Sequence, residues 1–352
     1  MPQFEIKIAG VGLPQNVLRD VVQVTYKDNI KELDSFEITV NNWDAVGRKF
    51  KYVGSETKQT LESEPMHRLF DPCKHDVEVL MGYGADPTLT LMVKGNFTTI
   101  EPNFPSSGAP TLTVRGLNIL HKLRSKQYTW AWTKQKESQI ADSFNTLPDP
   151  DKKGKKRFPL PVEIDQNALG TEKEIEYVAQ NNQYDIEFLL GRARRIGYVI
   201  FLKEEERKND KVVKPRRLYF GPSDSNHPGL RVVTFELEWG VSLIDFKPTL
   251  TTANQIKNVT VNGWDRKARK AITGKASLDD PKLKLNKDLI ELLEKCDARE
   301  EQVVDEPCFT QKQADDRAKA ILLERSKEMV KASATCVGSA SRASPWRRLT
   351  SR

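Results

Sequence analysis

The sequence predicts an α+β protein that is mainly β, in which two β domains flank a small α+β insert. Apolar residues alternate with polar ones over the first third of the chain and again beyond residue 231, a period of two that is typical of strands with one buried face. Between these stretches the apolar spacing becomes helical before short strands return. We therefore expect three successive parts, residues 1–125, 126–230 and 231–338, followed by an atypical basic tail at 339–352.

The first part contains six stretches in which apolar residues alternate. They are Phe4, Ile6 and Ile8; Val22, Val24 and Tyr26; Phe36, Ile38 and Val40; Val77, Val79, Met81 and Tyr83; Leu89, Leu91 and Val93; and Leu112 and Val114. Gly, Pro, Asn and Asp separate these stretches, as expected for turns. Six such strands predict a closed or nearly closed antiparallel barrel, or a sandwich, and closure would leave no unpaired edge strand.

A long polar segment from Asp44 to Cys73 interrupts this strand pattern. Loops of that length are usually functional or ordered by a partner. The segment mixes charged residues with four large apolar ones, Phe50, Tyr52, Leu69 and Phe70. We therefore expect this segment to be functional or to be ordered by a partner.

The insert contains three helix signals. Ile140, Phe144 and Leu147 fit one helix face, which Pro148 ends. In TEKEIEYVAQ a capping box predicts a helix that begins at its first residue; the box residues are Thr171 and Glu174. The third helix is predicted from a stripe of apolar residues, Ile186, Leu189, Leu190 and Ala193, with Gly197 at its left-handed C-terminal cap. Strands YVIFL and LYFG follow, joined by a charged hairpin-like connection from Lys203 to Arg217.

Beyond residue 231 the chain returns to strands and then adds helices. Two alternating stretches predict strands, Val233, Phe235 and Leu237, then Val259 and Val261. One helix is predicted from Leu289, Leu292 and Leu293. Another begins at a capping box of Thr310 and Gln313, and its apolar face carries Ala314, Ala318, Ile321 and Leu322. MVKASATCVG then begins a further strand.

Composition favours an ordinary soluble globular protein, with 38% hydrophobic and 30% charged residues among 352. The longest apolar runs fall short of the roughly 18–20 residues that a membrane-spanning helix needs. The N-terminal sequence MPQFEIKIAG is typical of a strand rather than of a signal peptide. The default expectation is therefore a cytosolic product.

Much of the net charge of +7 comes from the C-terminal end, where the last sixteen residues contain four arginines and no acidic residue. Two other basic clusters, Lys152–Arg157 and Lys214–Arg217, have no aromatic residues interleaved with them. Because stacking aromatics accompany cations in single-stranded nucleic-acid sites, we predict that both clusters are solvated loops, and we expect no nucleic-acid partner.

Neither the cysteines nor the histidines form a site motif. Cys73, Cys296, Cys308 and Cys336 include no C-x-x-C pair and no histidine at zinc-finger spacing, so we predict free thiols. The spacing of His67, Asp71 and His75 would suit a metal ion on a helix, but Pro72 disfavours that helix. His121 and His227 are predicted to be structural or loop residues, because no G-x-S-x-G nucleophile motif accompanies them.

Two remaining patterns are also assigned to structure rather than to chemistry. The acidic run from Lys203 to Arg207 offers carboxylates for glycoside hydrolysis, yet consecutive glutamates in a hairpin are typically a solvated face. The sequence GVG at Gly10–Gly12 lacks the rest of any phosphate-binding pattern. We predict no catalytic, cofactor-binding or metal-ligating residues and no cofactor.

Four stretches carry a resemblance to a known family. They are NFTTIEPNFPSSGAPTLTVRGLNILHKL, EIEYVAQNNQYDIEFLLGRARRIGYVIFL, FKPTLTTANQIKNVTVNGWDRKARKAI and QADDRAKAILLERSKEMVKASATCVG. In this order and spacing the chain resembles the phage late control protein D family over most of residues 1–338. These are baseplate hub proteins of contractile tails, related to the N-terminal part of VgrG-type spikes in type VI secretion and in extracellular contractile injection systems.

The resemblance implies a non-enzymatic homotrimer. Two tail-tube-like antiparallel β-barrel domains in each subunit would present a pseudo-sixfold ring to a hexameric inner tube protein, and the opposite end would seat a spike tip protein. Other baseplate proteins would be neighbours, and no membrane contact is implied in the assembled resting state. The protein would assemble in the bacterial cytoplasm and then belong to a virion-like phage tail or injection particle, whether or not the cell releases it.

The resemblance also assigns the stretch APTLTVRGLNILHKL to a barrel frame. Leu112 and Val114 would be core residues of a strand, Gly116 the turn, and His121 part of the frame. After ATCVG, where the family continues into closing strands of the second barrel, this chain reads SASRASPWRRLTSR. We expect a basic tail there without those strands and an exposed sheet edge.

Two other classes of function remain open from the sequence. A tail-associated cell-wall hydrolase would need a carboxylate pair in a cleft, and a peptidoglycan zymogram would detect it. A basic nucleic-acid-binding module would bind DNA with an affinity that falls steeply with salt.

Overall fold

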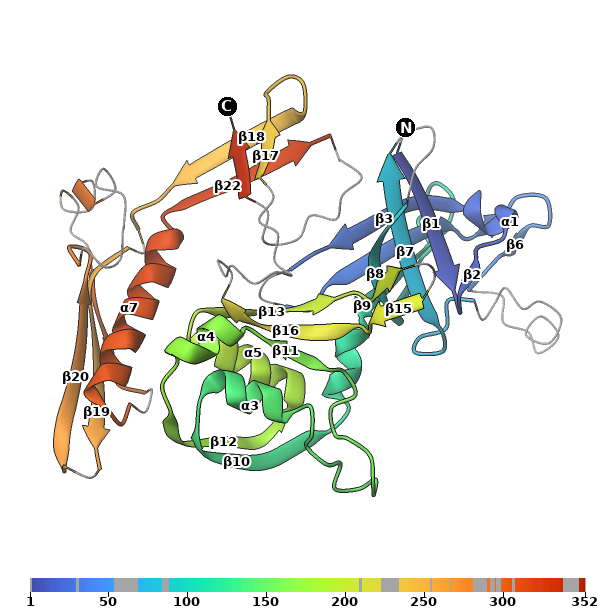
Figure 1. The fold of residues 1–352 in the computed structure, drawn as a ribbon. Helices are drawn as coiled ribbons and strands as arrows, with labels where there is room; N and C mark the ends of the chain where they lie inside the picture. The colour runs from blue at the N-terminus through green and yellow to red at the C-terminus, as the bar shows by residue number, and fades with distance from the viewer. Residues whose placement is uncertain are drawn as a thin grey trace. The chain divides into compact units, whose positions relative to one another are not determined.

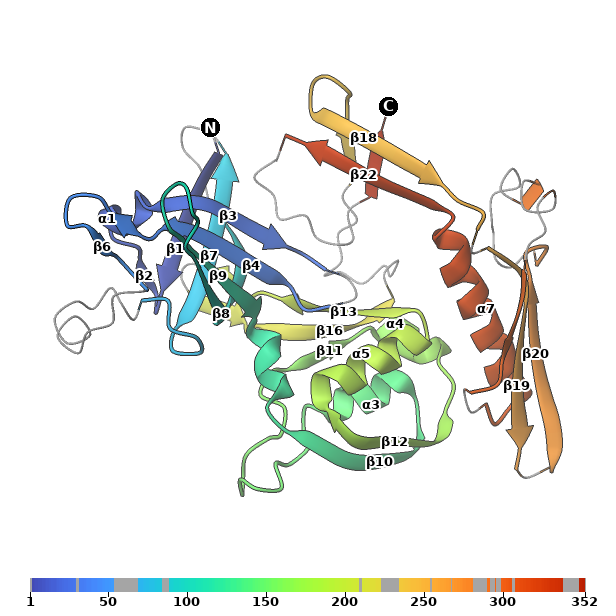
Figure 2. The same ribbon diagram turned by 180° about the vertical axis from the view of Figure 1, so that it is seen from behind.

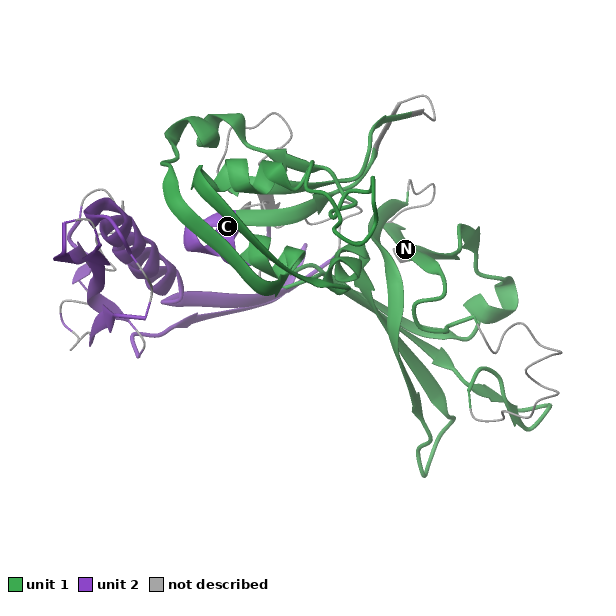
Figure 3. Ribbon diagram, turned by 90° about the horizontal axis from the view of Figure 1, so that it is seen from below, with its two compact units in different colours: residues 1–190, 199–234, 338–348 green, residues 191–198, 235–337, 349–352 purple. Residues whose placement is uncertain are grey.

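The structure is a computed structural model that describes residues 2–29, 32–53, 69–83, 89–208, 211–222, 234–253, 255–266, 268–280, 290–291, 295, 299–305, 308–337 and 348–351. Two compact units are coloured separately in Figure 3. Unit 1 comprises residues 1–190, 199–234 and 338–348, and unit 2 comprises residues 191–198, 235–337 and 349–352. Strands outnumber helices in the described residues, which confirms the prediction of an α+β protein that is mainly β.

Unit 1 begins with a seven-stranded antiparallel sheet (Figure 1). Its strands are β1 (Pro2–Ile8), β2 (Val11–Gly12), β3 (Val21–Lys27), β4 (Ser35–Asn41), β7 (Asp76–Tyr83), β8 (Thr90–Asn103) and β9 (Thr111–Asn118). Their order is β2-β1-β7-β8-β9-β4-β3, so β2 and β3 lie at the two ends without pairing to each other. The predicted closed barrel is therefore wrong for the described residues. β2 has only two residues before helix α1 (Gln15–Leu18), too few to pair along β3.

One apolar core nevertheless joins the two ends of this sheet. Ile8 of β1 and Val40 of β4 belong to the same cluster of buried residues, with Val24 of β3 packed against it. The sheet therefore folds over on itself. The alternation in β1, β4, β7 and β9 is confirmed by the burial of its inward residues, such as Ile38, Val79 and Val114.

Two local details of this sheet differ from the predictions. Val22 is 66% exposed, because the register of β3 shifts between Val21 and Gln23 and a bulge turns Val22 away from the core. Gly116 is a residue of β9 rather than a turn. A Cβ atom at Gly116 would lie 2.2 Å from Cζ of Phe36, so glycine makes room for that buried ring.

The ends of the long polar segment pack into the core of the chain itself. Two short strands, β5 (Trp43–Asp44) and β6 (Lys49–Phe50), form a hairpin. Tyr52 and Phe70 are buried with their ring centroids 5.2 Å apart. These ends therefore pack on the core of the chain itself, and the ordering of residues 44–75 by a partner stays a prediction. Residues 54–68 lie outside the described residues.

The insert follows β9 and the short 3-10 helix η2 (Ile119–Arg124) in the chain. Its elements are β10 (Gln127–Gln135), α3 (Glu137–Ser143), β11 (Val162–Ile164), α4 (Gln166–Thr171), β12 (Ile175–Tyr184), α5 (Asp185–Arg195), β13 (Tyr198–Lys203), β14 (Glu206–Lys208), β15 (Lys211–Lys214) and β16 (Arg217–Pro222). β10 pairs with β12, β14 with β15, and β11, β16 and β13 form a three-stranded sheet. Helices α3 and α5 are confirmed, as is the left-handed Gly197, at φ 72°.

The helix predicted to begin at Thr171 is wrong. Thr171 ends helix α4, and the following residues form β12, which pairs with β10 from Ile175 to Tyr184. The N-cap of α4 is Asp165, whose side chain accepts hydrogen bonds from the amides of Asn167 and Ala168. Pairing with a strand more than forty residues earlier outweighs the local capping pattern.

Unit 2 contains a helix packed on a small sheet, together with two strand pairs. Its elements are β17 (Thr234–Leu237), β18 (Leu243–Leu250), β19 (Ile256–Asp265), β20 (Lys270–Ser277), β21 (Arg299–Val303), α7 (Gln311–Lys327), β22 (Val330–Cys336) and β23 (Arg348–Ser351). The sheet order is β20-β19-β21, and the pairs are β18-β22 and β17-β23. No closed barrel forms from the described strands of this unit either, because each of its sheets has only two or three strands.

Helix α7 is confirmed with its predicted cap and apolar face. Oγ1 of Thr310 accepts a hydrogen bond from the Gln313 amide at 3.2 Å. Its four predicted apolar residues are buried against β19 and β20. Gly274 of β20 lets the helix approach closely, since a Cβ atom there would lie 2.2 Å from the carbonyl carbon of Ala314. Val233 and the predicted leucine helix at Leu289, Leu292 and Leu293 lie outside the described residues.

Candidate functional site

Strands β18 and β22 form a long two-stranded ribbon in unit 2, side by side in both views of the fold (Figures 1 and 2). The pairing is antiparallel, with Leu250 opposite Val330 and Phe246 opposite Ala334. Residues directly opposite each other in an antiparallel pair share a face, and so do residues two apart in one strand. The register therefore assigns every side chain of the ribbon to one of two faces.

One face of the ribbon is apolar and the other is polar. The apolar face carries Phe246, Pro248, Leu250, Val330, Ala332 and Ala334. The polar face carries Asp245, Lys247, Thr249, Lys331, Ser333 and Thr335. We call the first set the ribbon apolar face. It has the composition of a sheet surface that packs on a core.

The ribbon apolar face is exposed. Phe246 is 43% exposed, Leu250 55% and Val330 50%. At its two ends the ribbon is anchored by buried Leu243 and by Met329, which precedes β22. Two-stranded hairpins are marginal in water unless a further strand or layer covers them, and contiguous exposed apolar patches mark interaction sites. The arrangement is suited to assembly with another protein surface.

The histidine and cysteine candidates that the structure describes do not come together in a site. Nδ1 of His121 lies 2.9 Å from the Asn118 carbonyl oxygen, within η2. The His75 carbonyl accepts a hydrogen bond from Asn96, and Asp71 pairs with Lys74. Cys73 is exposed, Cys308 is buried and Cys336 is half-buried. His67, His227 and Cys296 lie outside the described residues.

Other sequence candidates also occupy ordinary structural positions. GVG belongs to the tight turn between β1 and β2, where Ala9 and Gly10 both have positive φ. Glu204 of the acidic run pairs with Arg216. Across the described ranges, His, Cys, Asp and Glu side chains form no group of three or more that could hold a metal ion. Nor does any described helix combine the length and apolarity needed to span a membrane.

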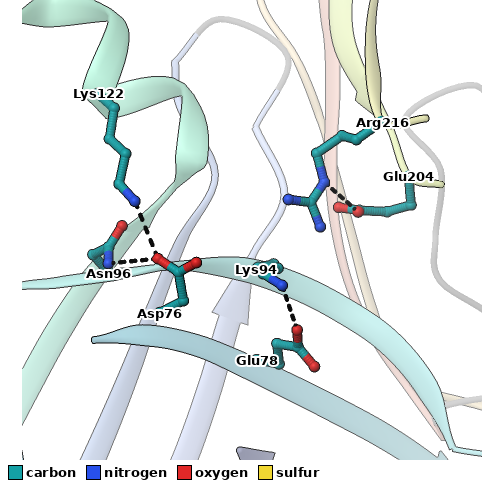
Figure 4. A network of polar contacts seen from close by, with 7 residues as sticks. All are labelled: Asp76, Glu78, Lys94, Asn96, Lys122, Glu204 and Arg216. Atoms are coloured by element: carbon teal, nitrogen blue, oxygen red, sulfur yellow. Dashed lines mark hydrogen bonds and ion pairs between the residues drawn. The ribbon is translucent and has the colours of Figure 1, made fainter. Parts of the chain in front are cut away.

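The polar contacts of unit 1 pair its charged groups with one another (Figure 4). Asn96 and Lys122 both donate to Oδ1 of Asp76, at 3.0 and 3.1 Å. Burial acts to raise the pKa of Asp76, but these two donors hold it below its usual value. Lys94 donates to Glu78 at 2.7 Å. These contacts join β7, β8 and η2, so we assign them to the frame.

The basic clusters are not wholly solvated loops, because each contains a buried arginine. Arg157 closes the first cluster, and its Nη2 lies 3.0 Å from Oδ1 of Asp185 and 2.9 Å from Oε1 of Gln180. The side chains of Arg157 and Asp185 are only 2% and 4% exposed. Burial lowers the pKa of Arg157 and raises that of Asp185, while their mutual attraction opposes both shifts.

The second cluster supplies the other buried cation. Arg217 and Lys203 both donate to Glu163, from β16 and β13 to β11. Although burial acts to raise the pKa of Glu163, these hydrogen bonds hold it below its usual value. The contacts cross the three-stranded sheet of the insert. Sequence reasoning missed both buried arginines, because their partners are distant along the chain.

Comparison with models of known protein families shows to which family the chain belongs. The sequence model of the Alg8 N-terminal domain matches residues 1–345. The chain belongs to the Alg8 N-terminal domain family. This is not the late control protein D family that the motifs indicate. No curated protein matches the chain.

The fold of this Alg8 N-terminal domain family member is that of phage tail proteins. The tail protein from Neisseria meningitidis MC58 is similar at a TM-score of 0.61 and 12% identity, over 100% of this chain and 86% of that one. A 43 kDa tail protein of prophage MuSo2 from Shewanella oneidensis is similar at a TM-score of 0.56 and 14% identity, over 96% of this chain and 83% of that one. Prophage tail protein gp18 from Listeria monocytogenes EGD-e is similar at a TM-score of 0.51 and 11% identity, over 94% of this chain and 79% of that one.

Proposed function

We propose that the protein is a structural, non-enzymatic hub of a phage tail or of a phage-derived contractile injection system. Three copies form a homotrimer that joins a hexameric inner tube to a spike tip and contacts other baseplate proteins. Residues 1–125 and 231–338 act as the two tail-tube-like domains, separated by the insert at 126–230 and followed by the tail at 339–352. No cofactor, nucleic acid or resting membrane contact is part of this role.

The ribbon apolar face is the observation that carries the proposal. It has the register and composition of a buried sheet face, yet it is exposed. Apolar burial supplies most of the affinity in protein association. The fold shared with phage tail proteins supports an assembly role, and we propose that the ribbon apolar face is buried between subunits of the trimer. Assembly takes place in the bacterial cytoplasm, after which the protein is part of the tail or injection particle.

The trimer is tested by the native mass of the isolated protein. Light scattering coupled to size exclusion is expected to give three times the chain mass of 40.1 kDa, about 120 kDa. Dilution should dissociate the trimer to single chains. A single-chain mass at every concentration and at both low and moderate salt would contradict the homotrimer.

The role of the ribbon is tested by replacing Phe246 with aspartate. A charge on the ribbon apolar face would be buried without a partner, so we expect the trimer to weaken by about 30-fold or more, as for a hot-spot residue. Thr249→Asp is the matched control, because Thr249 lies on the polar face of the same strand. Equal effects of the two substitutions on the trimer would argue against burial of the apolar face.

A further inference from the structure

Charge is unevenly distributed over the three-stranded sheet of unit 2, although β21 begins with the exposed Arg299. Residues 266–277, the turn before β20 and the strand itself, contain five cationic residues and no acidic one. Residues 300–306, which include most of β21, contain four acidic residues and no cationic one. Of these, Lys270 and Lys275 on the basic side and Glu300 and Asp305 on the acidic side are exposed.

The two charged strands lie at opposite edges of that sheet. The order β20-β19-β21 places one strand between them. β19 is antiparallel to β20 and parallel to β21, so the two edge strands run in opposite directions. Suppose that the β20 edge of one copy lies beside the β21 edge of a second copy, so that the two sheets continue each other in the same orientation. The two neighbouring strands would then be antiparallel, which is the commoner arrangement in sheets.

The side chains at both edges are held in place by neighbours in the same unit. Asn258 of β19 donates to Glu300 at 2.9 Å. On the other edge, Gln311 of α7 donates to the Thr273 carbonyl at 2.7 Å, which satisfies one backbone acceptor of β20.

We propose that copies of this chain meet head to tail, with the basic β20 edge of one copy against the acidic β21 edge of the next. This inference rests on the proposed homotrimer and names the contact that orients it. Each copy offers one edge of each sign, so the contact is heterologous and three copies close a ring when the rotation between neighbours is one third of a turn. Like edges repel, which excludes head-to-head pairs.

The ribbon apolar face and the charged edges then have different tasks. Burial of the ribbon supplies affinity, which salt affects little. The charged edges set direction and partner choice, and complementary potentials raise association rates more than they raise affinity. Added salt therefore slows assembly of the wild-type chain.

The decisive experiment exchanges the charges of the two edges. One variant carries Arg266→Glu, Arg269→Glu, Lys270→Glu and Lys275→Glu, a second carries Glu300→Lys, Glu301→Lys and Asp305→Lys, and a third carries all seven substitutions. Each single-edge reversal is expected to raise the concentration at half-assembly by about tenfold or more, whereas the seven-site variant regains most of the wild-type value because the edges are again opposite in sign. Circular dichroism establishes that each variant is folded. The matched control is Lys152→Glu with Lys153→Glu, on an exposed loop of unit 1.

Mixing the two reversed variants in equal amounts gives a second, sharper readout. Every attractive contact then joins one variant to the other, and a ring of three must include one repulsive contact between like variants. We expect complexes of two chains, about 80 kDa, to predominate over three-chain rings. Efficient formation of mixed trimers would overturn the head-to-tail contact.

The outcomes also separate this inference from the proposed function. A wild-type trimer that neither single-edge reversal weakens, or that the seven-site variant fails to restore, overturns the edge contact and leaves the trimer intact. A wild-type chain that is single at every concentration overturns both. A basic-edge reversal that abolishes binding to a short DNA duplex at low salt, with the trimer unchanged, assigns that edge to phosphate binding instead and overturns the proposal.

Discussion

Replacing Asp185 with alanine is expected to lower the free energy of unfolding of the insert by about 3–5 kcal/mol, because it leaves a buried guanidinium without its counter-charge. Arg157 also stacks on Tyr128 and Phe144, at 4.4 and 5.2 Å from the ring centroids, so it cannot turn out to water without breaking apolar contacts. Urea denaturation followed by circular dichroism measures the loss.

Two further variants make the Asp185 prediction specific. Glu187 lies in α5, like Asp185, and its Oε1 forms a partly exposed ion pair with Nε of Arg124 at 3.2 Å. Glu187→Ala removes that pair and should lower the free energy of unfolding by less than about 1 kcal/mol. Arg157→Met combined with Asp185→Leu removes both charges and should recover most of the loss, since well-packed apolar residues replace buried ion pairs at little cost. An Asp185→Ala loss no larger than that of Glu187→Ala would show that the pair is not effectively buried.

Gly274→Ala is expected to destabilise unit 2 by about 3 kcal/mol, at the upper end of the range for overpacked sites. The added methyl group would meet backbone on the α7 side, with the Ala314 carbonyl carbon and oxygen at 2.2 and 2.3 Å. Backbone cannot rotate away as a side chain can, so the helix must move off β20. Thermal unfolding monitored by circular dichroism reports the change.

Gly191→Ala serves as the opposite control for the glycine prediction. Gly191 lies inside α5, and a Cβ atom there would meet nothing within 4 Å. Alanine is a better helix former than glycine, so the free energy of unfolding of this variant should rise by about 0.5–1 kcal/mol. If Gly274→Ala were as well tolerated, the close packing of α7 on β20 would be wrong.

The sequence predicted those elements in which the local pattern and the tertiary environment agree. Phe36, Ile38 and Val40 alternate and are buried in β4, because that strand pairs on both sides. Helix α7 was predicted down to its cap at Thr310, since helix geometry brings residues three and four apart onto one face. In such stretches the spacing of neighbouring residues is enough to predict both the element and its buried face.

The wrong predictions have causes that lie in residues far away in the sequence. Thr171 ends a helix, rather than beginning one, because the following residues pair with β10. Val22 is turned outward by a bulge whose register depends on β4. Arg157 and Arg217 looked like loop cations, because neither Asp185 nor Glu163 lies near them in sequence. The closed barrels failed for a related reason, since closure depends on which strands meet at the ends of a sheet.

The candidate site shows the same division. The strand predicted to begin in MVKASATCVG is present as β22. No strand was predicted for the residues of β18, its partner. The pairing register and the exposure of Phe246 and Val330 reveal that the described chain leaves one complete apolar face open.

In the proposed trimer, the open face of the ribbon would affect how subunits join. Holding one residue in a single backbone conformation costs about 1–2 kcal/mol, and a two-stranded ribbon is marginal until another layer covers it. Part of the gross binding free energy would therefore be offset by the ordering of the ribbon at the interface. Early contacts would be correspondingly easy to break, so a wrongly placed subunit would leave before the proposed ring closes. Once every ribbon is covered, dissociation would require partial unfolding, and the closed ring would persist.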